Sequence, residues 1–556
     1  MFDLITFKRL FAQLNVLFTE RRADLNALDA AIGDGDHGDT MQRAMQAAAE
    51  ASQGEFPDLG KGFDAVAAAI AEYAGGAIGP VLAAFFAEGG LVLAGKQSAE
   101  LDDFQRFFAG GQEAVGQIGG AQIGDKTLLD ALAPASQALS ESKQEPLLAA
   151  LEAAANAAEK AAQATRDMVA AQGRAHFLGE RSKGHPDPGA SSFAMIVAGF
   201  SKAIKDEAHP ELEVAEEPIS NPPSGKLINQ PEDIVAEDNL GLALAYPGLL
   251  RKSEQGILIR AKEKAAGKVG LAMGHGGGHT PSMGGFVGPG LLDADVYGPV
   301  FTCASGVRIA DAIAQADKGA GVALLVSNHS GDVLNARLAL RRASQSGTTV
   351  KAVLLGDDIA TAPREQLEKR RGLGGLLFAL KIGGAAAERN ASLEEVITLM
   401  ENVNERTATL AVAVSAPTHP ASGIPLFELP KGEIEIGTGV HGEVGVYRGP
   451  QLPVNEIVDM LLEKLLADLN GLLNEEVLLF VNGAGGTSDT ELHITFQRAQ
   501  RQLEAQGLKV ASGVVGSFFT TQEMGGFSLS LCAATEDLMA DWNAPASGAA
   551  FRWPYE

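Results

Sequence analysis

One change in pattern divides this chain and limits what it can fold into. From Phe2 to about Ala208, apolar residues recur every three or four positions with much alanine, which is typical of amphipathic helices. Residues 206–225 are rich in Glu and Pro, and end in Asn-Pro-Pro-Ser-Gly, a composition typical of a linker. Beyond them, short apolar runs end in glycine clusters or polar turns. We therefore expect a multidomain protein.

The two parts predict different architectures. Residues 1–208 predict an all-α domain of antiparallel helices, a bundle or barrel, followed by a linker at 209–225. Residues 226–556 predict an α/β domain, in which ligands bind beyond the carboxyl ends of the strands. Short apolar runs resemble buried parallel strands with helical stretches between them, at 269–273, 321–326 and 350–355.

Composition limits the partners. A chain of 556 residues should hold more than one core, and a net charge of −26 argues against a nucleic-acid partner, because phosphate contacts need clustered Lys and Arg. The first residues lack the order of a signal peptide, and we find no apolar run long enough to span a bilayer. Two cysteines, Cys303 and Cys532, cannot build a disulfide scaffold. We expect a cytoplasmic protein without a membrane partner.

An acidic, glycine-rich stretch at residues 29–41 carries the first chemical signal. Asp29, Asp34 and Asp36 fall within eight residues, and the glycines between them allow tight turns. Asp and Gly are also ordinary turn residues, but three adjacent carboxylates repel one another without a cation. The spacing does not fit an EF-hand loop. Mg²⁺ prefers a few carboxylates together with the oxygens of a bound phosphate, so the stretch indicates a metal–nucleotide site.

Further glycine-bearing breaks interrupt the helical pattern at 75–80, 124–130 and 173–190. If these breaks gather at one end of the helical domain, the helix N-termini there are suited to anionic oxygens. Each break alone is weak evidence.

Histidines gather in glycine-rich turns of the second part. His275 and His279 follow the first predicted strand, His329 and Asp332 follow the second, and His441 lies in another glycine-rich turn. A single histidine in a turn is usually a tolerated polar residue. Several among only ten in the chain indicate an acid–base role in one cleft. Zinc is the rival interpretation, but the short paired spacings of a zinc site are absent and no cysteine joins them.

These motifs resemble the ATP-dependent dihydroxyacetone kinase family nearly end to end. The order here is nucleotide-binding domain first and ketose-binding domain second, the reverse of its best-known single-chain members. The segments that carry the resemblance in the first part are 33–38, 124–127, 173–174 and 178–190; in the second part they are 285–288, 331–335, 370–372, 435–437, 440–443 and 482–487.

The resemblance implies ATP with two Mg²⁺ ions held by Asp29, Asp34 and Asp36. It implies that the nucleotide is lined by His37, Gly38, Asp39, Thr40, Ala77, Ile78, Gly124, Leu128, Arg174 and Asp187. In the second domain, His441 attacks the ketose carbonyl and holds the sugar covalently, Asp332 accepts the proton of the attacking hydroxyl, and His279 assists. The implied substrate contacts are Gly276, Gly277, Gly278, His279, Ser327, Asp332 and His441.

Departures from the family pattern fall in the pockets. The segment Gly-His-Gly-Gly-Gly-His-Thr-Pro at 274–281 lacks a Ser and a Glu that the family usually has there. Met283 stands where the family commonly has a His. Ser327 replaces a Lys, His329 a Tyr and Ile78 a Ser. The shorter Ser327 favours a larger ketose than dihydroxyacetone, with four carbons such as erythrulose or five such as apulose.

Two other functions stay open from sequence. One is a phosphoenolpyruvate-dependent relay in which a partner protein rephosphorylates the nucleotide, although fusion of both domains argues against it. The other is a regulatory protein that captures a carbonyl compound without turnover, although the three aspartates and Asp332 argue against it. Fatty-acid kinases share the first domain type but lack this ketose domain. The family also leads us to expect a homodimer.

Overall fold

A computed structural model describes residues 2–33, 35–143, 145–205, 226–420, 423, 425–443 and 445–554, with the backbone alone of Arg174 and Phe177. The chain divides into two compact units, Met1–Pro218 and Ile219–Glu556, which we describe separately. Asp34 and the predicted linker at 209–225 lie outside the described residues.

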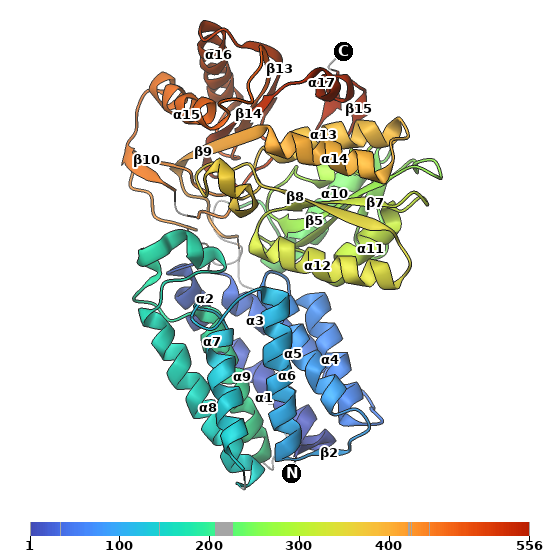
Figure 1. Cartoon of the computed structure of the whole chain (residues 1–556), viewed down its shortest axis with the longest axis vertical. Coiled ribbons are helices and arrows are strands. Elements are labelled where there is room, and N and C mark those ends of the chain that lie inside the picture. Colours follow the sequence, from blue (N-terminus) through green and yellow to red (C-terminus); the bar gives the residue numbers. More distant parts are fainter. Residues whose placement is uncertain are drawn as a thin grey trace. The chain divides into compact units, whose positions relative to one another are not determined.

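Unit 1 is a ring of helices (Figure 1). Its helices are α1 (Leu4–Glu20), α2 (Arg22–Ala30), α3 (His37–Ser52), α4 (Leu59–Tyr73), α5 (Ile78–Val92), α6 (Leu101–Gly119), α7 (Leu129–Glu141), α8 (Leu147–Ala164) and α9 (Pro188–Lys205). From α3 onward each helix packs against the next; α9 and α3 both pack against α1, which closes the ring. The predicted all-α barrel is confirmed, apart from a two-residue pairing of β1 (Phe2–Asp3) with β2 (Ser98–Ala99).

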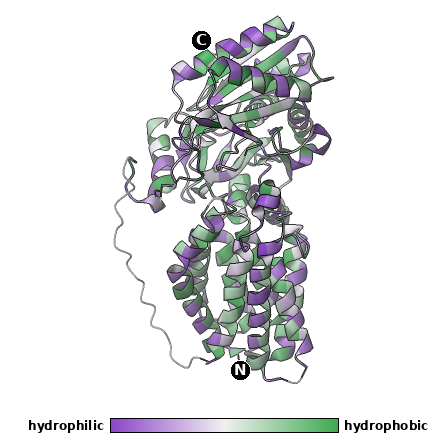
Figure 2. Ribbon diagram, turned by 90° about the vertical axis from the view of Figure 1, so that its left-hand side faces the viewer, coloured by the Kyte–Doolittle hydropathy of each residue, from purple (hydrophilic) through white to green (hydrophobic). Residues whose placement is uncertain are grey.

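Phenylalanines fill the interior of the ring. Phe63 contacts the rings of Phe7, Phe86 and Phe107 at centroid distances of 4.9–6.3 Å, and these side chains are fully buried. Along the helices, hydrophilic and hydrophobic residues alternate (Figure 2), as expected for helices with one face in a core. The core is therefore aromatic and dry, and the polar residues of interest lie at the ends of the helices.

Unit 2 begins with a six-stranded sheet in the order β3-β4-β6-β5-β7-β8. The strands are β3 (Leu250–Lys252), β4 (Leu258–Arg260), β5 (Gly270–Gly277), β6 (Ala294–Val300), β7 (Val322–Ser327) and β8 (Val350–Leu355). The last four in this order are parallel, as predicted. β5 continues to Gly277, four residues beyond its predicted end, because its glycines let it pair closely with β6.

Helices cover both faces of this sheet (Figure 1). Alternate strand residues enter different cores: Leu271 and Met273 pack with α13 (Gly375–Glu388) and α14 (Leu393–Glu405), whereas Ala272 packs with α11 (Gly306–Ala316). The second face is completed by α12 (Ser330–Gln345), and α10 (Ile234–Ala245) precedes the sheet. The predicted α/β architecture is confirmed.

A second six-stranded sheet, ordered β11-β10-β9-β14-β12-β13, completes unit 2. Its strands are β9 (Thr407–Ser415), β10 (Glu433–Ile436), β11 (Tyr447–Pro450), β12 (Glu476–Gly483), β13 (Lys509–Gly516) and β14 (Gly525–Ala533), all antiparallel except the β12–β13 pair. One face packs on α15 (Val454–Asp468) and α16 (Asp489–Ala505). The chain ends with α17 (Glu536–Trp542), β15 (Ala546–Ser547) and β16 (Arg552–Trp553).

Helix α13 lies between the two sheets and is buried from Gly375 to Ala387. Leu271 of the first sheet and Phe480 of the second belong to the core that surrounds it. The two sheets therefore share one core, and loops at their edges can meet. In the described part of the chain, no helix is both long and apolar enough to cross a membrane.

Candidate active site

The residues predicted from the sequence lie in two groups of polar side chains, one in each unit. In unit 1, the turn between α2 and α3 wraps around the Asp29 carboxylate, which accepts hydrogen bonds from the backbone N–H of Gly35 (2.8 Å) and of Asp36 (3.2 Å). Gly33 allows this close approach, because a Cβ there would lie 2.3 Å from Asp29 Oδ1. The glycines predicted to shape the acidic turn therefore do so.

Asp187 precedes α9 and is half-buried near the same turn. Its carboxylate accepts from the backbone N–H of Ala190 (2.6 Å), the geometry of a helix N-cap. Burial raises its pKa to about 7, and the charges of Asp130 and Asp29 act in the same direction. Such a concentration of carboxylates fits a site for hard divalent cations, since a cation relieves their repulsion.

The turn that follows Gly124 is built around two buried charges. Asp130 accepts from the N–H groups of Gly124 (2.6 Å) and Thr127 (2.7 Å). The Lys126 ammonium donates to the carbonyls of Ser182 (2.5 Å) and His185 (2.8 Å). Lys126 therefore holds the 173–190 segment against the start of α7.

The other predicted nucleotide residues lie at helix starts. Gly38, Asp39 and Thr40 are in the first turn of α3, Ala77 and Ile78 begin α5, and Leu128 immediately precedes α7. The His37 ring lies 2.9 Å from the Ser192 hydroxyl, and burial lowers its pKa. The carboxylate of Asp39 is paired with Arg22 at 2.8 Å. The side chain of Arg174 lies outside the described residues.

In unit 2, two histidines from different sheets meet. His279 follows β5 and His441 follows β10, and their Nε2 atoms are 3.1 Å apart. His279 Nδ1 lies 2.6 Å from the carbonyl oxygen of Thr520. A carbonyl only accepts, so Nδ1 carries the proton and Nε2 of neutral His279 is an acceptor. Burial, with the charge of His441, holds the pKa of His279 well below its usual range, which keeps it neutral.

Glu443 completes this group on the far side of His441. Its Oε1 lies 3.4 Å from His441 Nδ1, and its Oε2 accepts from the His441 backbone N–H at 2.9 Å. Burial alone would raise the pKa of Glu443, but hydrogen bonding to His441 and the charges of His441 and Arg371 hold it well below its usual range. Glu443 is therefore a carboxylate that can balance positive charge on His441.

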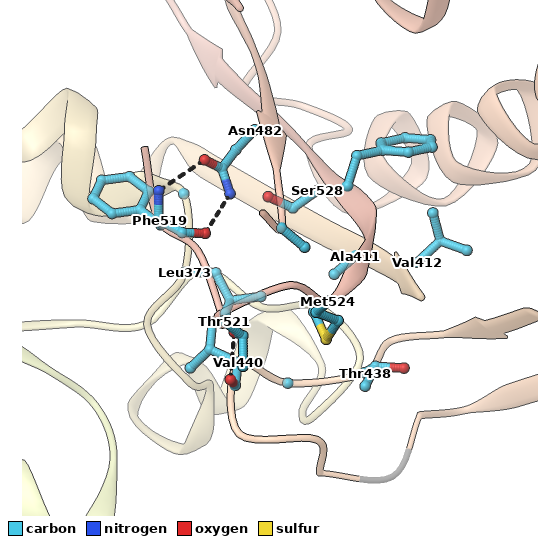
Figure 3. A pocket seen from close by; sticks show the side chains of 14 residues that line it. Leu373, Ala411, Val412, Thr438, Val440, Asn482, Phe519, Thr521, Met524 and Ser528 are labelled. Atoms are coloured by element: carbon cyan, nitrogen blue, oxygen red, sulfur yellow. Dashed lines mark hydrogen bonds between the residues drawn. The ribbon is translucent and has the colours of Figure 1, made fainter. Parts of the chain in front are cut away.

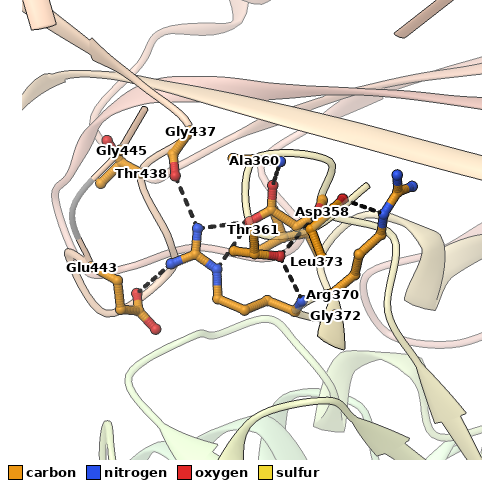
Figure 4. Close-up of polar contacts among 12 residues, drawn as sticks. Asp358, Ala360, Thr361, Arg370, Gly372, Leu373, Gly437, Thr438, Glu443 and Gly445 are labelled. Carbon is orange, nitrogen blue, oxygen red and sulfur yellow. Dashed lines mark hydrogen bonds and ion pairs between the residues drawn. The ribbon is translucent and has the colours of Figure 1, made fainter. Parts of the chain in front are cut away.

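A buried arginine supports Glu443 from behind. The Arg371 guanidinium pairs with Asp358 (2.7 Å) and donates to the Gly437 carbonyl (2.9 Å), and its Nη1 lies 3.8 Å from Glu443. Figure 4 shows Asp358, Gly437 and Glu443 around this group. A Cβ on Gly439 would lie 2.2 Å from Glu443 Oε2, so glycine is required there.

An apolar pocket lies beside the loops that carry the site, and Val440 is one of its lining residues (Figure 3). Its empty space is about 420 Å³, which includes open solvent. The Thr521 hydroxyl donates to the Val440 carbonyl (2.6 Å), and the Asn482 amide bonds both N–H and C=O of Phe519. These contacts position His441 and the Thr520 carbonyl together.

The remaining predicted residues of unit 2 lie at the ends of β5 and β7 and at the start of α12. Gly276, Gly277 and Gly278 are buried at the end of β5; Asp332 is buried in the first turn of α12. The Ser327 hydroxyl donates to the Gly372 carbonyl at 3.2 Å. His275 faces Asp295 at 3.3 Å and meets the Tyr297 ring edge to face, so it stabilises the sheet.

Sequence reasoning did not assign roles to Glu443, Arg371 and Thr520. Glu443 carried a signal, a carboxylate two residues after a histidine in a glycine-rich turn. Thr520 acts through its backbone carbonyl, which leaves no trace in the residue type.

Comparison with known proteins agrees with this division. The DAK2 domain family matches residues 31–202 and the Dak1 domain family matches residues 240–550. These matches define a kinase built from two domains in one chain. The chain belongs to the dihydroxyacetone kinase family, which confirms the resemblance and the domain order read from the motifs.

Similar proteins include both subunits and single-chain kinases. The dihydroxyacetone-binding subunit DhaK of PTS-dependent dihydroxyacetone kinase 1 from Listeria innocua is 36% identical over 316 residues, 57% of this chain and 96% of that protein. L-erythrulose kinase of Pectobacterium atrosepticum is 34% identical over 330 residues, 59% of this chain and 56% of that protein.

Two solved structures also match. The dihydroxyacetone kinase from C. freundii in complex with AMP-PNP and Mg²⁺ is 28% identical, with a TM-score of 0.54, over 58% of this chain and 60% of that one. The dihydroxyacetone kinase operon co-activator Dha-DhaQ is 32% identical, with a TM-score of 0.54, over 58% and 98%.

Proposed function

We propose that this protein is an ATP-dependent kinase that phosphorylates a terminal hydroxyl of a short-chain ketose held covalently on His441. The observation that carries the proposal is the ordered row Thr520 carbonyl, His279, His441, Glu443, in which each hydrogen-bonding atom has a defined partner. Such a row is suited to moving one proton while an imidazole nitrogen attacks a carbonyl.

These residues can supply and accept every proton that moves during capture of the ketose. His441 starts with a proton on each ring nitrogen; its Nε2 passes one proton to His279 Nε2, and the freed lone pair attacks the carbonyl carbon of the ketose. His279 then gives that proton to the carbonyl oxygen, so a C–N bond and a hydroxyl replace the C=O π bond. His441 keeps a proton on Nδ1, and the positive charge on the ring faces Glu443. Polyols offer no electrophile, so the step selects ketoses.

For the phosphoryl transfer we assign Asp332 as the base that accepts the proton of the attacking hydroxyl. Asp29, Asp34 and Asp36 would hold two Mg²⁺ ions, which when bound neutralise charge on the transferred phosphoryl group. Helix starts at α3, α5, α7 and α9 would face the nucleotide phosphates, as backbone N–H groups there are suited to anions.

Ser327 favours a four- or five-carbon ketose such as erythrulose or apulose over dihydroxyacetone. Its hydroxyl is directed to the Gly372 carbonyl, so the side chain extends less into a substrate site than a lysine would. The similarity to L-erythrulose kinase also supports a preference for a ketose larger than dihydroxyacetone. A panel in which dihydroxyacetone exceeds every larger ketose in kcat/KM would remove this part of the proposal.

The test is an assay of ADP release over ketoses, aldoses and glycerol, repeated with His441→Ala and Asp36→Asn. We expect turnover with ketoses only, loss of turnover in both variants, and weakened nucleotide binding in Asp36→Asn alone. Full activity of His441→Ala would exclude covalent capture. Light scattering on the same samples tests the expected homodimer.

The phosphoenolpyruvate-dependent relay is the second candidate, because similar proteins include subunits of PTS-dependent kinases. If phosphorylated ketose forms only when phosphoenolpyruvate and a carrier protein are present, the relay replaces our proposal. If the ketose binds but is never phosphorylated under either condition, the regulatory interpretation replaces it.

A further inference from the structure

His329 enters the active site beside His441. It lies between β7 and α12, and its ring centroid is 5.3 Å from that of His441. Its Nδ1 is 3.7 Å from Glu443 Oε1, the same oxygen that faces His441 Nδ1 at 3.4 Å. One ligand atom from each of His329, His441 and Glu443 lies within 4.8 Å of the other two. Two imidazoles and one carboxylate oxygen thus converge.

Each ring can carry a proton on Nε2, directed away from this point. His329 Nε2 lies 3.3 Å from the Gly372 carbonyl, which accepts, so its neutral ring carries the proton on Nε2 and a lone pair on Nδ1. His441 Nε2 donates to His279, whose acceptor state is fixed by Thr520. When His441 carries only the Nε2 proton, it also presents an Nδ1 lone pair to Glu443; in the charged ring, Nδ1–H is directed at Glu443 instead. In the singly protonated form three electron-rich atoms face one another, so this point is occupied either by the Nδ1 proton or by a metal ion.

The surroundings match those of metal ligands in proteins. Ligating histidines usually donate their other ring N–H to a carbonyl or a similar acceptor, as His329 does to Gly372. Ligating carboxylates are themselves hydrogen-bonded, and Glu443 Oε2 receives the His441 N–H while Oε1 stays directed at both imidazoles. The exposed fractions of the ligand side chains are small: 13% at His329, 9% at His441 and 7% at Glu443.

We propose that His329, His441 and Glu443 form a Zn²⁺ site in which the metal competes with the proton on His441 Nδ1. Two ligands at about 2.1 Å around a tetrahedral ion lie about 3.4 Å apart, close to the separations of 3.4 and 3.7 Å seen here. Two imidazoles and one carboxylate with an open fourth position are a common zinc set. Mg²⁺ prefers all-oxygen sites such as the aspartate turn of unit 1.

The inference has a consequence for catalysis, and this part rests on the proposed function. With the metal on Nδ1, Glu443 faces Zn²⁺, so the positive charge that attack on the ketose carbonyl places on the His441 ring lies beside a cation instead of being balanced by the carboxylate. Zn²⁺ therefore inhibits ketose capture reversibly, and a chelator restores it. Because the family commonly has Tyr where this chain has His329, the inhibition is specific to chains that carry this histidine.

Co²⁺ gives a test that does not depend on activity. The full-length protein is titrated with Co²⁺ in excess Mg²⁺, and the strong visible absorption of tetrahedral Co²⁺ is followed. We expect one equivalent per chain, displaced by Zn²⁺, and loss of the band in His329→Tyr and Glu443→Gln. The exposed His493→Tyr on α16 is the matched control and keeps the band. By calorimetry, Zn²⁺ affinity falls more than about 100-fold in His329→Tyr.

The outcomes separate this inference from the proposed function. A wild-type protein with only the weak octahedral Co²⁺ spectrum, or a His329→Tyr variant that keeps the strong band, overturns the Zn²⁺ site. A strong band in a protein that turns over no ketose supports the site and removes the kinase proposal instead. Where turnover is measured, Zn²⁺ inhibits the wild type, while the residual activity of His329→Tyr is insensitive at the same concentration.

Discussion

Asp187 makes the stability of unit 1 depend on pH in a way that one substitution removes. Its pKa is raised to about 7, chiefly by burial and then by Asp130 and Asp29. The native state therefore keeps a proton that the unfolded chain has lost above its ordinary pKa of 3.8. The stability from this group is complete below that value and is lost as the pH rises through about 7.

The magnitude follows from the interval between the two pKa values. At about 1.4 kcal/mol per pKa unit, the interval from 3.8 to about 7 corresponds to about 4 kcal/mol at most. Between about pH 5 and about pH 8 the wild type should lose about 3 kcal/mol from this group, or about 6–12 °C in Tm for a unit of this size. Asp187→Asn has no proton to lose and should escape this decrease.

The assay is urea unfolding of the full-length protein without Mg²⁺ or nucleotide, at both pH values. Both tryptophans, Trp542 and Trp553, lie in unit 2, so fluorescence follows unit 2 alone, and a circular-dichroism transition without a matching change in fluorescence belongs to unit 1. Asparagine preserves the N-cap to Ala190. Asp58→Asn, at the cap of α4 with Lys61 N–H at 2.9 Å, is the matched control and should follow the wild type.

The reasoning is refuted if Asp187→Asn and wild type lose the same stability between the two pH values. It is also refuted if the difference appears in the fluorescence transition rather than in circular dichroism. Addition of Mg²⁺ with a nucleotide should stabilise the wild type more than the variant at the higher pH, because bound cations favour the ionised carboxylate.

Three further predictions test other parts of the molecule. Phe63→Ala should lower the stability of unit 1 by about 3–5 kcal/mol, because it leaves a cavity among packed rings; urea unfolding followed by circular dichroism measures it. Lys126→Met should expose the 173–190 segment to limited proteolysis, since three carbonyls lose their donor; an unchanged digestion pattern contradicts this. Wild type should lose unit 2 stability as pH falls below about 6.5, where the unfolded chain protonates His279 and the native state does not, and His279→Gln should lose less; fluorescence-detected unfolding decides.

The fold class was predictable because its signals are local. Helical periodicity before residue 206 and short apolar runs after it reflect which faces are buried, and burial is decided within a few residues of each position. The end of β5 was misjudged, because glycines usually signal a turn but here permit a strand to pair closely with β6.

The candidate site was predictable only in part. His279 and His441 stood out as histidines in glycine-rich turns, and the structure brings them to 3.1 Å although 162 positions separate them. The contact of His329 with Glu443 arises from two loops of different sheets, and nothing local in either loop announces the other. The Thr520 carbonyl is common to every residue type, so its role is visible only in three dimensions.

Because α13 lies between the two sheets, capture of a ligand can change how firmly the sheets are held together. His279 belongs to one sheet and His441 to the other, and apart from loops these sheets are joined through that buried helix. A ketose bonded to His441, with its oxygen held by His279, would therefore link the two sheets directly. Amide hydrogen exchange should then slow in β5 and β10 together upon sugar addition, before any phosphate is transferred.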